Sequence, residues 1–126
     1  MPFFSPLVSR RFLYASAGLT AFTIYKHTEI CINELFPAID ENLGPDSLLA
    51  FTAKGNYLNT SATYVTMLIL QLKWAKHGLT AKYDKILLVW YLLQSFMFGV
   101  AYLRKAFYTP LLAWWGIPAL MGMSQL

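Results

Sequence analysis

Two histidines, His27 and His77, are the residues of this chain best suited to hold a haem or a metal ion. Imidazole is a common ligand for transition metals, and haem iron is often held by histidine. Each histidine stands just beyond a charge-free stretch, so we expect the two to lie at opposite ends of membrane-crossing helices, roughly 30 Å apart. One haem could not use both, and we expect no cofactor held by this chain alone. Either histidine could still contact a group shared with another chain.

The acidic side chains are spaced in a way that does not suit catalysis or metal binding. Glu29 and Glu34 are five residues apart, so they would not share one face of a helix. The run from Asp40 to Asp46 lacks the alternating acids and the final glutamate of a calcium loop. No nucleophile elbow, phosphate-binding loop or dinucleotide fingerprint occurs in the sequence. The single cysteine, Cys31, can form no internal disulfide. We therefore predict no catalytic or metal site and interpret the acids as a solvated or docking surface.

Charged residues are absent from four stretches, and this pattern predicts the fold. Residues 12–25, 57–72, 86–103 and 107–123 contain no Asp, Glu, Lys or Arg. A helix needs roughly 20 mostly apolar residues to cross a bilayer core. Only 13% of the residues are charged, whereas soluble domains average about 25%. We predict a single all-α membrane domain over residues 1–126 with three to four transmembrane helices. The expected spans are about 7–25, 57–76, 86–103 and 107–123.

The long segment between the first two spans, residues 26–56, is polar and carries a net charge of −3. We predict an acidic extramembrane loop here. Asp46 or Ser47 could cap a short helix to about Ala53, because such side chains accept hydrogen bonds at a helix start, and Gly55 would end it. The first span is interrupted by two arginines, so it either crosses at a tilt or lies partly in the interface.

The basic residues mark the ends of the expected spans. If all four segments cross, one side of the membrane receives a net charge of +5 and the other −1, and both chain ends face the positive side. We expect these lysines and arginines to contact phospholipid head groups, with cardiolipin as a candidate ligand. Their scattering over the segment ends argues against binding of nucleic acid. The predicted interfacial residues are Arg10, Arg11, Lys73, Lys76, Lys85, Arg104 and Lys105.

Small residues four positions apart predict where the helices pack. Ala17 and Ala21 in the first span, and Ser95 and Gly99 in the third, would let helices approach closely. Gln94 is strongly polar within an apolar stretch, so we expect it to bond to a neighbouring helix. The charge-free stretches also lack the ionisable groups that proton relays and transporters keep in the membrane.

These features together predict a structural role. The first 28 residues contain three basic residues and no acid, a composition typical of a mitochondrial import signal. An ordinary cytoplasmic end of a membrane protein would have the same composition. We expect a non-catalytic accessory subunit of a large mitochondrial inner-membrane complex, whose partners are other membrane subunits and lipids. A respiratory-chain complex is favoured because such complexes hold more accessory subunits. The alternatives are an accessory subunit of ATP synthase, a small four-helix membrane enzyme or carrier, and residence in another cellular membrane.

Overall fold

The computed structural model describes residues 5–126, and their backbone is helical apart from short connections. Two π-helical turns, η1 (Cys31–Leu35) and η2 (Leu112–Gly116), lead into α2 and α5. No strand occurs within this described range, so the all-α prediction is confirmed. The α-helices in chain order are α1 (Pro6–Ile30), α2 (Phe36–Leu43), α3 (Leu48–His77), α4 (Lys82–Arg104) and α5 (Ile117–Met123).

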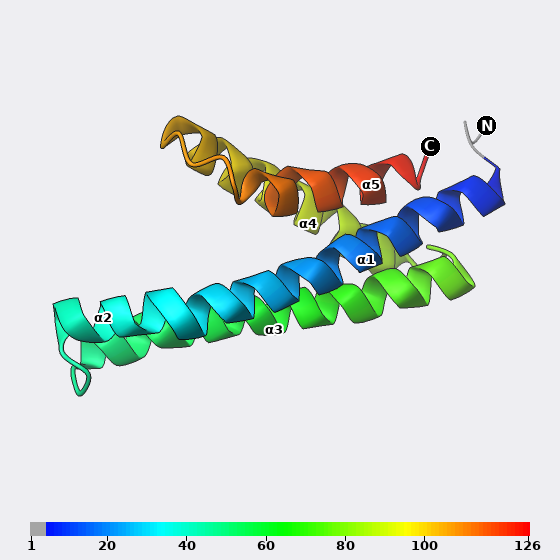
Figure 1. Cartoon of the computed structure of the whole chain (residues 1–126). Helices are drawn as coiled ribbons and strands as arrows, with labels where there is room; N and C mark the ends of the chain where they lie inside the picture. The colour runs from blue at the N-terminus through cyan, green and yellow to red at the C-terminus, as the bar shows by residue number, and fades with distance from the viewer. Residues whose placement is uncertain (1–4) are drawn as a thin grey trace.

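The segments α1, η1 and α2 follow one another without a break, and α3 runs back along them as the second arm of a long helical hairpin (Figure 1). α3 has 30 residues, so it is about 45 Å long. The chain reverses at residues 44–47, where Gly44 adopts a positive φ of 81°. Ser47 then caps α3, because its hydroxyl accepts a hydrogen bond from the N–H of Ala50 at 3.0 Å. The hairpin is the most extensive helix contact among residues 5–126.

The acidic region 26–56, predicted as an extramembrane loop, is instead the closed end of this hairpin. Only residues 44–47 form a turn, and helix occupies both sides of it. The predicted cap at Ser47 is present, but the helix does not stop at Gly55 and continues to His77. An interior glycine costs a helix only about 1 kcal/mol relative to alanine, and packing against α1 and α2 outweighs this. The loop prediction was wrong because charged side chains that are exposed or half-buried are compatible with helix, and only Asp46 of these charged residues lies in the turn itself.

Both π-helical turns end two residues before a proline. In η1 the N–H of Phe36 bonds to the carbonyl of Cys31, five residues back, and Pro37 follows. η2 has the same relation to Pro118. A proline has no N–H for the carbonyl four residues earlier, and its ring crowds that carbonyl. A wider turn just before it relieves the crowding, so the helical segments pass both prolines without ending.

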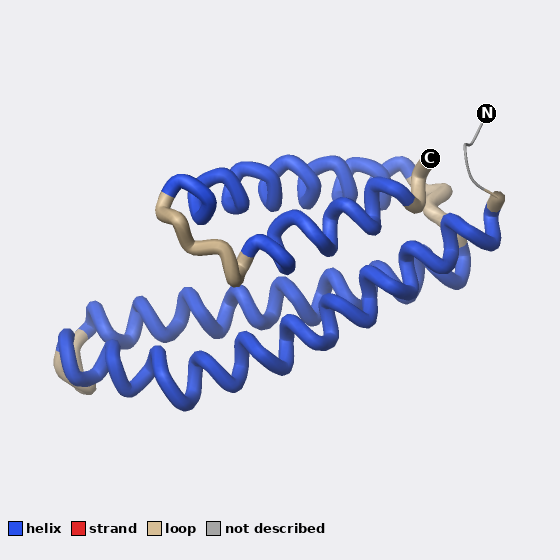
Figure 2. The backbone as a smooth tube through the Cα atoms, turned by 45° about the horizontal axis from the view of Figure 1, so that its top comes forward, coloured by secondary structure: helices blue, strands red, loops and turns tan. Residues whose placement is uncertain are grey.

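The helices α4 and α5 form a second pair, which packs on the half of the hairpin nearest the termini (Figures 1 and 2). α5 lies between α1 and α4 and contacts both. The other half of the hairpin extends beyond this pair (Figure 1). The buried core between the layers contains Leu13, Met67, Trp74, Ala75, Leu88, Tyr91, Ile117 and Met121.

On length and composition, α4 is the one helix of the described range that could cross a membrane by itself. With 25 and 30 residues, α1 and α3 are long enough but less apolar. The apolar segment Leu112–Met123 is too short. By this test the helix containing the expected span 86–103 qualifies. The helices containing the spans about 7–25 and 57–76 do not, and the span 107–123 contains only a short helical segment.

Candidate functional site

The buried face of α1 is built from small residues. Ser16 and Thr20 are fully buried and Ala17 nearly so, whereas Ala21 is exposed. The hydroxyl of Ser16 donates to the carbonyl of Leu13 at 2.8 Å, and that of Thr20 donates to the carbonyl of Ser16 at 2.9 Å. A buried helical stripe alternates steps of three and four residues, so a step of three from Ala17 to Thr20 stays inside while a step of four to Ala21 turns outward. Of the predicted pair, only Ala17 therefore lies in the helix contact.

Both residues of the predicted pair on α4, Ser95 and Gly99, are buried, and Gly99 lies against η2. The indole of Trp115 is so close to Gly99 that a Cβ atom added there would overlap the ring. Trp115 also donates its Nε1–H to the carbonyl of Phe96 at 3.4 Å and stacks on the Phe96 ring. The close approach at Gly99 is thus made by an aromatic side chain rather than by a second helix backbone.

The buried residues of α4 form one narrow stripe along the helix, with steps of four and three residues from Asp84 to Gly99. The rest of the α4 surface is mostly exposed. Gln94, which we expected to bond to a neighbouring helix, lies on this exposed side. It does so because its position falls between those of the stripe, one residue before Ser95. The outward surface of α4 is therefore largely apolar, with Gln94 as a polar interruption.

Sequence reasoning missed Gln71 of α3, which is fully buried. Its side-chain Nε2 donates to the sulfur of Met121 in α5 at 3.2 Å, and Met121 is also fully buried. This contact joins the hairpin to the α4–α5 pair. The residue spacing could have indicated that Gln71 is buried, because it shares a helical stripe with Met67 and Trp74, at steps of four and three residues.

Three helix ends bring basic residues together. Arg10 at the start of α1 and Lys76 at the end of α3 line one hollow of about 290 Å³. The Nζ of Lys73 bonds to both carboxylate oxygens of Asp84 at 2.9 and 3.0 Å, which ties the end of α3 to the start of α4. Lys73 holds the pKa of the Asp84 carboxyl below its usual value. We use the term basic end for the set Arg10, Arg11, Lys73, Lys76, Lys82 and Lys85.

The remaining predicted interfacial residues, Arg104 and Lys105, lie exposed at the opposite end of α4. Two further lysines form ion pairs, Lys26 with Glu29 within α1 and Lys54 with Asp40 near the turn of the hairpin. The Lys54 pair joins α3 to α2. Charged groups thus occur towards both ends of the bundle.

The two histidines lie apart: His27 is about midway along the α1–α3 hairpin, opposite Ser61, and His77 ends α3. The Nδ1 of His27 lies 3.0 Å from the hydroxyl oxygen of Ser61 and 3.7 Å from the sulfur of Cys31, and its ring meets the edge of Tyr64. His77 lies at the basic end. Within residues 5–126, no three His, Cys, Asp or Glu side chains lie close enough to hold a metal ion. The His27 group is a polar contact between α1 and α3.

Apolar side chains cover the outer faces of the long helices. Phe22 of α1, Leu58 and Ile69 of α3, and Trp90 and Met97 of α4 are all more than half exposed. Across the described residues, exposed large apolar side chains outnumber the buried apolar ones. Extensive exposed apolar surface is typical of contact with lipid or with other chains. No family model, curated protein or solved structure matches this chain, so the argument for its function depends on these surfaces.

Proposed function

We propose that the chain is a non-catalytic accessory subunit of a large mitochondrial inner-membrane complex, and of a respiratory-chain complex in particular. The observation that carries this proposal is the outward apolar surface, which exceeds the apolar core. A soluble monomer rarely exposes a contiguous apolar patch larger than a few hundred Å². Lipid tails and neighbouring membrane helices are surroundings in which such a surface is stable.

In this proposal α4 crosses the membrane. Its 23 residues are about 35 Å long, which suits a hydrocarbon core of about 30 Å. Lys82 and Lys85 lie at one end of the helix, and Arg104 and Lys105 at the other. Long basic side chains at both ends of an apolar helix can reach the head-group layers, so these four residues would frame the span.

The helices α1 and α3 cross beside α4 as a pair. Hydroxyl and amide side chains lower the mean apolarity of these two helices. Many of these groups, however, are buried or form hydrogen bonds within the protein, so they do not need water as a hydrogen-bond partner. Ser16, Thr20 and Gln71 are buried inside the bundle. The hydroxyls of α3 donate to carbonyls four residues earlier in the same helix, and polar groups satisfied in this way are tolerated in lipid. These hydroxyls belong to Thr60, Thr63 and Thr66.

The basic end and the turn of the hairpin would then lie on opposite sides of the membrane. Because α3 is about 45 Å long, about 15 Å of the hairpin would project beyond the bilayer core. We name residues 31–54, which carry a net charge of −3, the hairpin tip. Leu48 and Phe51 in this tip are 80% and 74% exposed. Exposed apolar residues beside acids suit docking onto a partner subunit with a basic, partly apolar surface.

The mitochondrial assignment depends on the basic, acid-free composition of the first 28 residues. The preference for a respiratory-chain complex depends on the larger number of accessory subunits in such complexes. Residues 105–126 add the short helix α5 against α1 and α4, which widens the bundle without extending a span. This shape fits a peripheral subunit that fills space beside larger chains.

The proposal is tested by native electrophoresis of source membranes extracted with a mild detergent. The gel is probed for this chain, and the band that contains it is analysed for its other subunits. Co-migration with a complex of much greater mass supports the proposal, and the neighbouring subunits identify the complex. Migration of the chain alone, or as a small oligomer, would contradict it.

A further inference from the structure

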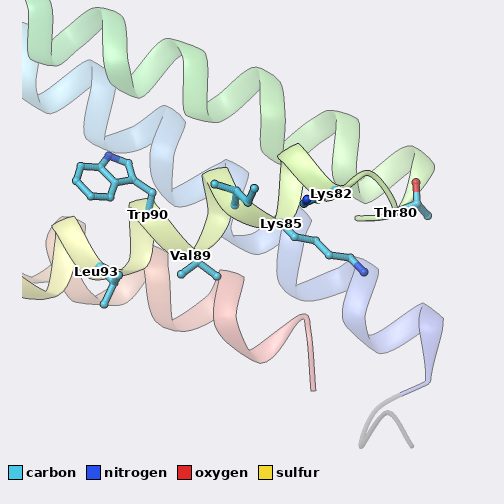
Figure 3. Close-up of a pocket in the computed structure, with 7 residues that line it drawn as sticks. Thr80, Lys82, Lys85, Val89, Trp90 and Leu93 are labelled. Carbon is cyan, nitrogen blue, oxygen red and sulfur yellow. The ribbon is translucent and has the colours of Figure 1, made fainter.

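A groove of about 520 Å³ lies on the outer face of α4, near the basic end. Figure 3 shows its residues along the first half of the helix, with lysines at one end and apolar side chains further along. Positions 82, 86, 89 and 93 follow steps of three and four residues, so they form one stripe, distinct from the buried stripe of α4. The groove is therefore a continuous surface feature with a charged end and an apolar end.

The charged end is formed by Lys82 and Lys85, one helical turn apart. Of the ion pairs formed within residues 5–126, none involves either lysine. The neighbouring acid, Asp84, is engaged by Lys73 instead. Two ammonium groups without a carboxylate partner suit an anionic phosphate group, and Thr80 also lines this end of the groove.

The apolar end is formed by Ile86, Val89, Trp90 and Leu93, which are 52%, 55%, 65% and 57% exposed. From Lys82 to Leu93 the helix rises by about 17 Å. One leaflet of a hydrocarbon core of about 30 Å is about 15 Å deep. The whole groove, from Lys82 to Leu93, therefore spans about one leaflet, and its apolar end, from Ile86 to Leu93, covers about 10 Å of that depth.

We propose that this groove binds one anionic phospholipid of the leaflet at the basic end. Its phosphate lies between Lys82 and Lys85, and one acyl chain follows α4 from Ile86 to Leu93. The proposal depends on the membrane placement proposed above. Among ligands of this size, a membrane phospholipid is the one whose charge, length and depth all match the groove.

The test uses the purified full-length chain in lipid nanodiscs made of phosphatidylcholine with a minor fraction of phosphatidylglycerol. One of the two lipids at a time carries bromine on its acyl chains, and quenching of tryptophan fluorescence is measured. We expect brominated phosphatidylglycerol to quench more strongly than an equal amount of brominated phosphatidylcholine. Trp90→Phe should remove most of this difference, because Trp90 lines the groove.

The double variant Lys82→Gln/Lys85→Gln should lower the preference for phosphatidylglycerol roughly tenfold, since each lysine near the surface contributes attraction to anionic lipid. The matched control Arg104→Gln/Lys105→Gln removes the same charge from the far end of α4 and should keep the preference. Equal quenching by both lipids, or an unchanged preference in the Lys82/Lys85 variant, would overturn the lipid site alone. Absence of quenching by either lipid would overturn the membrane placement as well, so the two failures are distinguishable.

Discussion

Gly99 of α4 lies directly against the indole ring of Trp115 in η2, in a space that no larger side chain can share. The contact holds the C-terminal segment on α4, and the hydrogen bond from Trp115 to Phe96 adds to it at 3.4 Å. At Gly18 or Gly122, by contrast, an added Cβ would meet no atom within 4 Å. Substitutions at Gly99 and at Gly18 can therefore be compared to test the packing against Trp115.

Replacing Gly99 with leucine should destabilise the chain by about 1–3 kcal/mol, because the new side chain overlaps the Trp115 ring and forces a local shift. Thermal unfolding in detergent, followed by tryptophan fluorescence, measures the loss. Gly18→Ala is the matched control, and we expect it to be neutral or slightly stabilising, because alanine favours helix. If Gly99→Leu unfolds at the wild-type temperature and still enters the native complex, the packing role of Gly99 is wrong.

The contact between Gln71 and Met121 predicts a coupled pair. Met121→Leu removes the sulfur that accepts from Gln71 and leaves the buried amide without that partner. We expect a loss of about 1–3 kcal/mol. Adding Gln71→Leu removes the unpaired amide as well, so the double variant should be more stable than Met121→Leu alone. A double-mutant cycle by chemical unfolding measures the coupling, and strictly additive effects would contradict it.

The Lys73–Asp84 pair predicts a loss of stability in acid. Lys73 holds the pKa of Asp84 below its ordinary value, so the folded state favours the carboxylate more than the unfolded state does. The contribution is fully present above the ordinary aspartate pKa of about 4 and is lost as the pH falls through the lower folded value. Unfolding temperatures measured across this range should fall less steeply for Asp84→Asn than for the wild type. Glu41→Gln, a change at an exposed acid of α2, is the control and should keep the wild-type slope.

We predict that a substitution in the hairpin tip can weaken assembly into the complex without affecting folding. Phe51 is 74% exposed on α3, so Phe51→Ser removes little buried area and should leave the unfolding temperature nearly unchanged. If the tip docks onto a partner subunit, the same change should reduce recovery of the chain in the large complex on a native gel. Thr52→Ser, at the adjacent exposed position, serves as the control. Full recovery of Phe51→Ser in the complex would show that the tip does not dock there.

Local signals in the sequence predicted several elements correctly. The apolar run 86–103 lies within α4, and Ser47 caps α3 as its hydroxyl chemistry suggests. In each case the deciding physics lies within one helix, where spacing and residue type carry the information.

Relations between helices were harder to predict. Polarity suggested a loop at residues 26–56, yet a hairpin with polar side chains on its exposed faces satisfies the same composition. The choice between Ala21 and Thr20 as the inward position depends on the angle at which α1 meets its neighbours, which spacing alone does not determine. Gln71 was overlooked because its partner, Met121, is 50 residues away in the sequence.

The π-helical turn η1 acts as a one-residue insertion between α1 and α2, which otherwise form one continuous helix, whereas η2 stands at the start of its helical segment, directly after Leu111. Hydrogen bonds that reach back five residues instead of four change the phase of everything that follows by about 100°. η2 sets the phase of α5 in the same way, and Ile117 and Met121 of α5 are both fully buried. Deleting one residue from within η2 would change the phase of α5 by about 100° and turn Met121 away from Gln71. The number of residues between Leu111 and Ile117, and not only their chemistry, therefore determines which face of α5 is buried.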